Sequence, residues 1–328
     1  MLGRLYSSFQ QVTPSIAVSH WLRHAISFGT SRPAVSVVIP FYGKKREIKV
    51  AIQALECQSF TNFEVVVVAD GCSFKAAQMK VLRQSGIAVQ VIRLSENCGA
   101  FAARIVGGAH ARGEYLWFLD HDDYVDAGFL RQMYTRAFDA KADMVECPFL
   151  VSEPNKAPSL SSRFNGKLER HGKDIFEAYL RGESHNNLAN KLIRRRCWTK
   201  AINSLEKMGI SQKQRLNFCE DMLCTITLFD IVNHYASTSD AHYVYCRRSG
   251  STINNGNREA VEACISDFAM ILSTLRPLLL QYSHSEAFVA FQVREVDWIL
   301  SNMLLRRVGN CLSPEAWNEV GRIQTMLK

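Results

Sequence analysis

Short apolar runs alternate with helical segments between residues 34 and 150, and this alternation constrains the fold more than any other feature. We expect strands at Val35–Ile39, Phe63–Ala69, Val89–Leu94, Tyr115–Leu119 and Met144–Cys147. Between and after them, apolar residues at helical spacing predict helices at Glu47–Cys57, Phe74–Gln84, Ala100–Ala111 and Ala127–Ala140. Such alternation predicts βαβ units with a parallel sheet. The nearly continuous apolar character of the strands predicts that helices cover both faces.

Polar residues stand at the carboxyl ends of the expected strands, where open α/β sheets bind their ligands. The first strand runs into Pro40-Phe41-Tyr42, the second ends in Asp70-Gly71, and the third is followed by Glu96-Asn97. The fourth strand ends in Asp120-His121-Asp122-Asp123. We therefore expect the chemistry of the chain at this edge of the sheet.

Three carboxylates crowd the end of the fourth strand, at Asp120, Asp122 and Asp123. Their mutual repulsion is costly unless a cation lies among them, and oxygen ligands select hard ions such as Mg²⁺ or Mn²⁺. The alternative is a solvated acidic turn that caps the next helix. We expect His121 to be a spacer and not a ligand.

Three further positions have both a functional and a structural interpretation. Asp70 either accepts a hydrogen bond from a nucleobase or closes a simple turn with Gly71. Arg104, in the helix that follows Asn97-Cys98-Gly99, either reaches a phosphate or an acidic partner or lies on the surface. Glu220-Asp221 precedes an apolar helix, and either supplies a general base for a hydroxyl or complements the helix dipole.

Composition restricts the partners and the location. The net charge of +8 fits nucleic acid, an anionic membrane surface or a phosphorylated substrate. No nucleic-acid module or long basic tail is present, so we do not expect nucleic-acid binding. The ten cysteines contain no CxxC pair, which predicts reduced, mostly buried thiols. Because no secretory signal and no uncharged apolar run of about 20 residues is visible, we expect a cytoplasmic protein.

The second half of the chain is less regular. Residues 151–175 have loop-like composition, and Phe218–Phe229 and the chain beyond Glu259 have helical spacing. Tyr243–Asn255 returns to strand and turn character. We expect the C-terminal helices to pack on the core; an oligomer face or a contact with a membrane is the alternative.

The order and spacing of these motifs resemble family 2 glycosyltransferases with the GT-A fold. The first half carries the resemblance most strongly, through the segments Val37–Tyr42, Gln58, Asn62–Ser73, Asn97–Gly99 and Ala103–Asp123. Asn190–Arg195 and Glu220-Asp221 look like later landmarks of that family. The resemblance covers roughly residues 35–255.

The resemblance implies a GT-A fold, with a mostly parallel sheet flanked by helices and a helical C-terminal region. It implies an inverting, metal-dependent transferase that uses a nucleotide sugar, above all a UDP-sugar, with Mn²⁺ or Mg²⁺. The acceptor would be a glycan or a lipid-linked hydroxyl in bacterial polysaccharide or glycolipid assembly, which would allow peripheral contact with the inner face of the plasma membrane. We divide the chain into an extension (1–33), a nucleotide-sugar half (34–150), an acceptor half (151–256) and a helical region (257–328).

The same resemblance assigns residues to the nucleotide. Pro40 and Tyr42 would line the nucleobase pocket, and Asp70 would bind the edge of the base. Asn97 and Arg104 would help to hold the nucleotide.

For the chemistry, Asp122 would be the first metal ligand, and Asp120 would lie nearer the ribose and the metal-bound waters. Asp221 would be the catalytic base, with Glu220 beside it contacting the acceptor or the sugar. The base needs only to be ionised at neutral pH, so we expect it to have a near-normal pKa.

The chain departs from the family pattern in three places. Gly43 stands where the family usually has Asn, and Ala69 replaces a second acidic residue, so Asp70 would bind the base alone. Many relatives have a His near the end of the catalytic region, whereas Tyr245–Ser251 has none. There Arg247 or Arg248 would contact the diphosphate instead. We expect the nearby His234 and His242 to be structural.

Three other functions are less well supported by the sequence. A sugar-nucleotide pyrophosphorylase would need a Gly-rich, Arg-containing loop after the first strand, where Pro40–Lys44 stands. A Rossmann dehydrogenase would need GxGxxG at the same point. A non-catalytic glycan- or nucleotide-binding protein with the same fold is the remaining alternative, and the intact Asp120–Asp122 and Glu220-Asp221 pairs argue against it.

Overall fold

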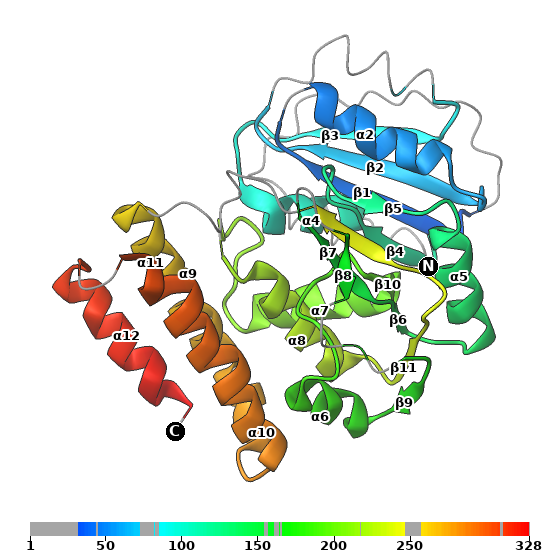
Figure 1. Cartoon of the computed structure of the whole chain (residues 1–328). Coiled ribbons are helices and arrows are strands. Elements are labelled where there is room, and N and C mark those ends of the chain that lie inside the picture. Colours follow the sequence, from blue (N-terminus) through cyan, green and yellow to red (C-terminus); the bar gives the residue numbers. More distant parts are fainter. Residues whose placement is uncertain are drawn as a thin grey trace.

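The computed structural model describes residues 32–43, 45–72, 82, 85–153, 157–160, 164, 166–216, 218–246, 257–308 and 311–327, with the side chains of 45–47 and 308 left undescribed. In this part of the chain, helices flank an eight-stranded sheet, and a second, four-stranded sheet and a group of C-terminal helices are added to it (Figure 1). Residues 1–31 of the predicted extension lie outside the described residues. So does the predicted helix Phe74–Gln84, except for Leu82.

The large sheet is mixed, with the order β3-β2-β1-β4-β10-β6-β11-β9. Its strands are β1 (Val35–Phe41), β2 (Phe63–Ala69), β3 (Val89–Arg93), β4 (Tyr115–Phe118), β6 (Met144–Glu146), β9 (Glu169–His171), β10 (Lys191–Arg194) and β11 (His234–Ser237). β3, β2, β1 and β4 are parallel neighbours, which confirms the predicted parallel core. β10 then runs antiparallel to both β4 and β6, β11 is parallel to β6, and β9 is antiparallel to β11.

Alternate side chains of the central strands point to opposite faces of the sheet, and each face has its own apolar core. Val38, Val66 and Phe118 lie in the first core, and Val37, Val67 and Trp117 lie in the second. The first core includes helices α4 (Gly99–His110), α6 (Lys173–Arg181), α7 (Arg195–Lys207) and α8 (Glu220–Ile231). The second includes α2 (Lys45–Glu56) and α5 (Phe129–Asp139). Helices therefore cover both faces, as the continuous apolar strands predicted.

The smaller sheet has the order β5-β12-β7-β8. Its strands are β5 (Tyr124–Val125), β7 (Phe149–Ser152), β8 (Ser159–Leu160) and β12 (Tyr243–Cys246). The prediction that residues 151–175 form a loop was therefore wrong at β8, at β9 and at the start of α6. These strands are short, and their partners lie far away in the sequence, so local composition does not reveal them.

The C-terminal region is helical, as predicted, and lies to one side of the sheets (Figure 1). Its elements are α9 (Arg258–Leu279), η2 (Leu280–Tyr282), α10 (Glu286–Phe291), η3 (Gln292–Asp297), η4 (Ile299–Leu305), α11 (Arg306–Val308) and α12 (Pro314–Met326). α9 packs against α12 and α8, and α10 packs against α6. Among the described residues, one helix (Arg258–Tyr282) has the length and composition to cross a membrane, and half of its apolar window is buried inside the protein. That burial accounts for its apolar character.

Two adjacent glycines let α4 approach its neighbours closely. A Cβ atom on Gly107 would lie 2.3 Å from Val38 Cγ1 of the sheet, and one on Gly108 would lie 2.4 Å from Trp198 Nε1 of α7. Both contacts are far below van der Waals separation. The close packing fixes α4, and with it Arg104, over the carboxyl edge of the parallel strands.

Candidate functional site

A buried arginine, Arg104 of α4, joins carboxylates from two distant parts of the chain. Its Nη2 lies 3.1 Å from Asp120 Oδ1 at the end of β4. Its Nη1 lies 3.2 Å from Glu220 Oε1 and 2.9 Å from Asp221 Oδ1, at the start of α8. Of the interpretations left open for Arg104, the structure therefore shows the acidic partner. It also brings Asp120 together with the Glu220-Asp221 pair.

Three carboxylates share this one guanidinium, so their negative charge is only partly compensated. Burial raises the pKa of Asp221 to about 7; Arg104 opposes the rise, and the charges of Glu220 and Asp120 add to it. The expectation of a near-normal pKa for the catalytic base was therefore wrong. Burial alone would lower the pKa of Arg104, but the three carboxylates raise it well above its ordinary value.

The turn after β4 separates its three carboxylates. Asp123 is buried and accepts hydrogen bonds from the Tyr243 hydroxyl (2.6 Å) and the Cys246 amide (2.9 Å) of β12. Burial, with the charge of Asp120, raises the pKa of Asp123 to about 8. Asp120 and Asp122 stay half-buried, and a metal ion at these two carboxylates stays a prediction. The acidic turn does not cap α5, because the residue before that helix is Gly128 and no side chain caps it.

Asp70 has a structural partner that the sequence did not indicate. Its two carboxylate oxygens accept hydrogen bonds from the amides of Cys98 (2.7 Å) and Gly99 (2.8 Å), at the N-terminus of α4. The adjacent Gly71 has a φ of +62°, and a Cβ there would lie 2.1 Å from the Asn97 nitrogen. Asp70-Gly71 therefore ties the end of β2 to the turn that begins α4, and a role in nucleobase binding stays a prediction.

The remaining predicted nucleotide residues lie near the same edge. Pro40 is buried within β1, opposite Val68 of β2, whereas Tyr42 just beyond the strand is 60% exposed. Asn97 is half-buried, and its Oδ1 accepts a hydrogen bond from the Gly99 amide. Arg247 and Arg248 lie outside the described residues.

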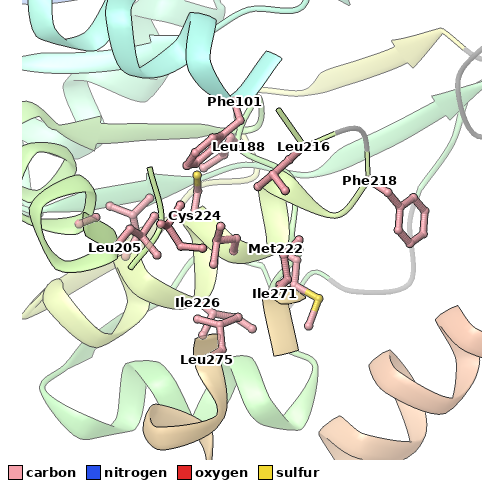
Figure 2. Packing of buried hydrophobic residues seen from close by; sticks show 14 of the residues in the cluster. Phe101, Leu188, Leu205, Leu216, Phe218, Met222, Cys224, Ile226, Ile271 and Leu275 are labelled. Carbon is pink, nitrogen blue, oxygen red and sulfur yellow. The ribbon is translucent and has the colours of Figure 1, made fainter. Parts of the chain in front are cut away.

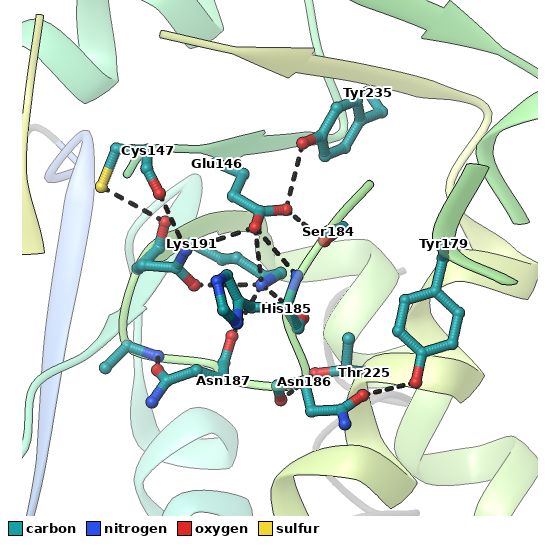
Figure 3. A network of polar contacts seen from close by, with 12 residues as sticks. Glu146, Cys147, Tyr179, Ser184, His185, Asn186, Asn187, Lys191, Thr225 and Tyr235 are labelled. Carbon is teal, nitrogen blue, oxygen red and sulfur yellow. Dashed lines mark hydrogen bonds and ion pairs between the residues drawn. The ribbon is translucent and has the colours of Figure 1, made fainter. Parts of the chain in front are cut away.

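A fully buried ion pair organises the loop that precedes β10, and sequence reasoning missed it. Lys191 Nζ of β10 lies 3.4 Å from Glu146 Oε1 of β6, and both side chains are completely buried. The same ammonium donates hydrogen bonds to the carbonyls of His185 (2.9 Å) and Asn187 (2.7 Å) (Figure 3). The loop of residues 184–190 therefore curls around the lysine. A charged residue inside each of two apolar runs, Met144–Cys147 and Leu188–Ile193, was the available signal.

This loop also contacts Asp221 and the C-terminal helices. The Leu188 amide donates a hydrogen bond to Asp221, and Thr225 Oγ1 of α8 donates one to the Asn186 carbonyl (2.7 Å). The Asn186 side chain donates to Glu295 Oε2 of the C-terminal region (2.8 Å). The pair Glu146–Lys191 thus fixes the loop, and the loop fixes Asp221.

Apolar packing holds the rest of α8. Met222, Cys224 and Ile226 are buried, and the core around them includes Leu205 of α7 and Ile271 of α9 (Figure 2). The residue before the helix, Cys219, has a φ of +59°. A left-handed conformation at a non-glycine residue costs about 1 kcal/mol and is retained only where the surroundings enforce it. The packing of α8 and the backbone conformation of Cys219 together fix the positions of Glu220 and Asp221 at the start of the helix.

Comparisons with known proteins agree with this fold. Residues 36–202, just over half of the chain, match the model of glycosyl transferase family 2. EpsH of Bacillus subtilis (strain 168) is 28% identical over 162 residues, which are 48% of this chain and 46% of that protein. The succinoglycan biosynthesis protein ExoO of Rhizobium meliloti (strain 1021) is 27% identical over 240 residues, covering 71% of this chain and 66% of that one. The chain thus spans less than half of EpsH and about two thirds of ExoO.

The crystal structure of S. aureus TarS 1-349 in complex with UDP-GlcNAc shares the fold. It superimposes with a TM-score of 0.59 at 20% identity, covering 90% of this chain and 81% of that one. The likeness extends beyond the family model to α8 and the C-terminal helices. On the family match, which includes Asp70, Arg104 and Asp120–Asp123, the chain belongs to glycosyl transferase family 2.

Proposed function

We propose that this chain transfers a sugar from a nucleoside-diphosphate sugar to an acceptor hydroxyl with inversion at the anomeric carbon. One observation carries the proposal. Arg104 holds Asp120, at the carboxyl edge of the parallel sheet, and the Glu220-Asp221 pair within one buried ionic cluster. A donor bound at the edge and a base at the start of α8 therefore face the same space.

The donor is proposed to be a UDP-sugar. The TarS structure, which shares this fold, holds UDP-GlcNAc. In this chain the exposed ring of Tyr42 is available to stack on the base, and Asn97, just before α4, is half-buried. Arg247 or Arg248 is proposed to add a cation at the diphosphate.

A divalent cation is proposed to bind at Asp120 and Asp122. The donor set fits Mg²⁺ or Mn²⁺, because it consists of carboxylate oxygens alone and both side chains are only half-buried. Such an ion would neutralise charge on the departing nucleoside diphosphate. Arg104 holds Asp120 in place through Oδ1.

Asp221 is proposed to be the general base. Its carboxylate takes the proton from the acceptor hydroxyl while that oxygen attacks the anomeric carbon, and the bond to the diphosphate oxygen breaks on the opposite face. Because the pKa of Asp221 is raised to about 7, its carboxylate is a stronger base than an ordinary aspartate and is still largely ionised at slightly alkaline pH. Glu220 is proposed to contact the acceptor or the sugar.

The proposed setting is bacterial surface-polysaccharide or glycolipid assembly, by a cytoplasmic or peripherally membrane-bound enzyme. ExoO, one of the relatives, is named for succinoglycan biosynthesis. We propose that residues 34–150 bind the nucleotide sugar and that residues 151–256 bind the acceptor. The two halves share one sheet, since β10 of the acceptor half pairs with both β4 and β6 of the donor half.

The test is a donor screen. The purified protein is incubated with a panel of UDP-, GDP- and dTDP-sugars in Mg²⁺ or Mn²⁺, with and without EDTA, and release of nucleoside diphosphate is measured. Asp122→Ala and Asp221→Asn should each abolish release from the donor that the wild type uses. Asp139→Asn, on the exposed surface of α5, is the matched control and should behave as wild type.

Two results would overturn the proposal. The first is the absence of binding to any nucleotide sugar by calorimetry. The second is binding without release in the presence of a mixed glycan acceptor pool, which would support a non-catalytic binding protein. Retention of the anomeric configuration in the product, determined by proton NMR, would overturn the inverting step alone.

A further inference from the structure

A second cluster of potential metal ligands lies at the far edge of the large sheet. β9 is the last strand of the sheet and pairs with β11 alone within it. Glu169 and His171 lie two residues apart on β9, so their side chains point to the same face. His234 of β11 is the register partner of His171 across the antiparallel pair. The potential ligand atoms of all three residues lie within 4.8 Å of one another.

The two histidine rings lie against each other across the strand pair. Their ring centroids are 4.1 Å apart, and the rings are tilted by 35°. His234 Nε2 lies 3.2 Å from Glu169 Oε2. Two imidazole nitrogens and a carboxylate oxygen therefore stand close enough together to share one ion.

Arg136 of α5 orients the carboxylate of this cluster. Its Nε and Nη2 donate hydrogen bonds to the carbonyls of Ser237 (3.0 Å) and Leu168 (2.9 Å), which anchor the guanidinium to both strands. Its Nη1 then binds Glu169 Oε1 at 2.8 Å. The other oxygen, Oε2, is left directed at His234. The hydrogen bond from His234, together with Arg136, also lowers the pKa of Glu169, so that carboxyl is ionised at neutral pH.

We propose that Glu169, His171 and His234 form a binding site for a transition-metal dication of the zinc type. Two imidazoles and one carboxylate are a ligand set that zinc accepts, with a fourth position open to water. Zinc bonds of about 2.0–2.2 Å place tetrahedral ligand atoms about 3.4 Å apart, which side-chain rotation reaches from the present separations. The metal replaces the hydrogen bond between His234 Nε2 and Glu169, and the imidazole proton then resides on Nδ1. Arg136 acts as the outer partner that such ligands usually have.

This site differs from the proposed catalytic one in both chemistry and place. Asp120 and Asp122 offer oxygen alone, which selects hard ions, whereas the nitrogen ligands of the histidine site select softer ones. The histidine site lies on β9 and β11, at the opposite end of the sheet order from β3, β2 and β1. A metal there links an edge strand to its neighbour, and so opposes fraying of that edge.

The experiment is a zinc titration of the full chain after EDTA treatment and dialysis, in excess Mg²⁺ so that the carboxylate site is occupied. Calorimetry and a thermal unfolding curve are recorded for wild type, His171→Ala, His234→Ala and His284→Ala. We expect zinc to raise the Tm of wild type and of His284→Ala, the exposed control. We expect either of the other two variants to bind zinc more than about tenfold more weakly. Co²⁺ should give the visible absorption of a tetrahedral site in wild type and lose it in the same two variants.

The cysteines are free, and thiolates are also zinc ligands, but the cysteines are identical in every variant, so only the difference between variants counts. Glu169→Gln keeps both histidines and should weaken zinc binding as well, which gives a second test if an alanine variant folds poorly. The proposal is overturned if wild type binds no zinc under these conditions. It is equally overturned if His171→Ala and His234→Ala bind it as tightly as His284→Ala.

Discussion

The proposed donor half (34–150) and the proposed acceptor half (151–256) share one sheet, yet different contacts hold them. In the donor half, β1–β4 are parallel and their side chains alternate between two apolar cores. In the acceptor half, the strands change direction at β10, and the loop beside the base is built around the buried pair Glu146–Lys191. A periodic apolar pattern is enough to specify the first kind of structure. The second depends on buried polar groups whose partners come from distant segments of the chain.

The sharpest way to break this comparison is to remove one partner of the buried pair. Lys191→Met leaves the completely buried Glu146 with uncharged donors alone and takes the ammonium from the carbonyls of His185 and Asn187, so we expect the free energy of unfolding to fall by about 3–5 kcal/mol. Chemical denaturation measures the change. The matched donor-half variant is Arg112→Met, which removes an exposed arginine from the buried Glu64. Glu64 keeps the Ser36 hydroxyl and the Arg112 amide, so we expect a loss of about 1 kcal/mol. Equal losses of unfolding free energy in the two variants would contradict the view that buried polar contacts matter more in the acceptor half.

The stability of the donor half should instead depend most on the close packing of α4 against the sheet. Gly107→Ala would place a methyl group 2.3 Å from Val38 Cγ1, forcing α4 away from the sheet, and we expect a loss of about 1–3 kcal/mol. Gly321→Ala in α12 is the control, because no heavy atom lies within 4 Å of its Cβ position. There we expect a gain of about 0.5–1 kcal/mol from helix propensity. Thermal unfolding of both variants measures the two effects; a loss of similar size at Gly321 would contradict the packing argument.

The pH dependence of transfer tests the base in the acceptor half. Since ionised Asp221 is the active form and its pKa is raised to about 7, kcat at saturating substrates should rise about tenfold between pH 6 and pH 8. Glu220→Gln removes a charge that raises this pKa, so its profile should shift to lower pH. A wild-type profile that is flat over this range would exclude Asp221 as the titrating base.

The smallest loss of stability is expected for a variant of Asp70, whose carboxylate binds the N-terminus of α4. Asp70→Asn keeps one acceptor oxygen for the amides of Cys98 and Gly99, and we expect a loss of about 1 kcal/mol in stability. If Asp70 also binds the nucleobase, the affinity for UDP, measured by calorimetry, should fall as well. A loss of stability with unchanged UDP affinity would confine Asp70 to its structural role.

Much of the donor half was predictable because its signals are local. Alternation of apolar runs indicated the parallel core, and polar residues at strand ends indicated its carboxyl edge, where Asp70 and Asp120 do lie. The short strands β8 and β9 were missed, since their sequences resemble loops and their pairing is with distant segments. The free thiols were also expected, and all but the exposed Cys57 and Cys311 are buried or half-buried.

By itself, the sequence determined which residue types stand at the carboxyl edge of the sheet, because side-chain periodicity follows directly from backbone geometry. Only the tertiary structure decided which partner each of those residues contacts. It turned Asp123 inward to Tyr243 and joined Arg104 to Glu220, 116 residues away, and it enclosed Lys191 beside Glu146. A buried charge or polar group needs a partner, and that partner is chosen by the position of strands and helices in space, which no local pattern records.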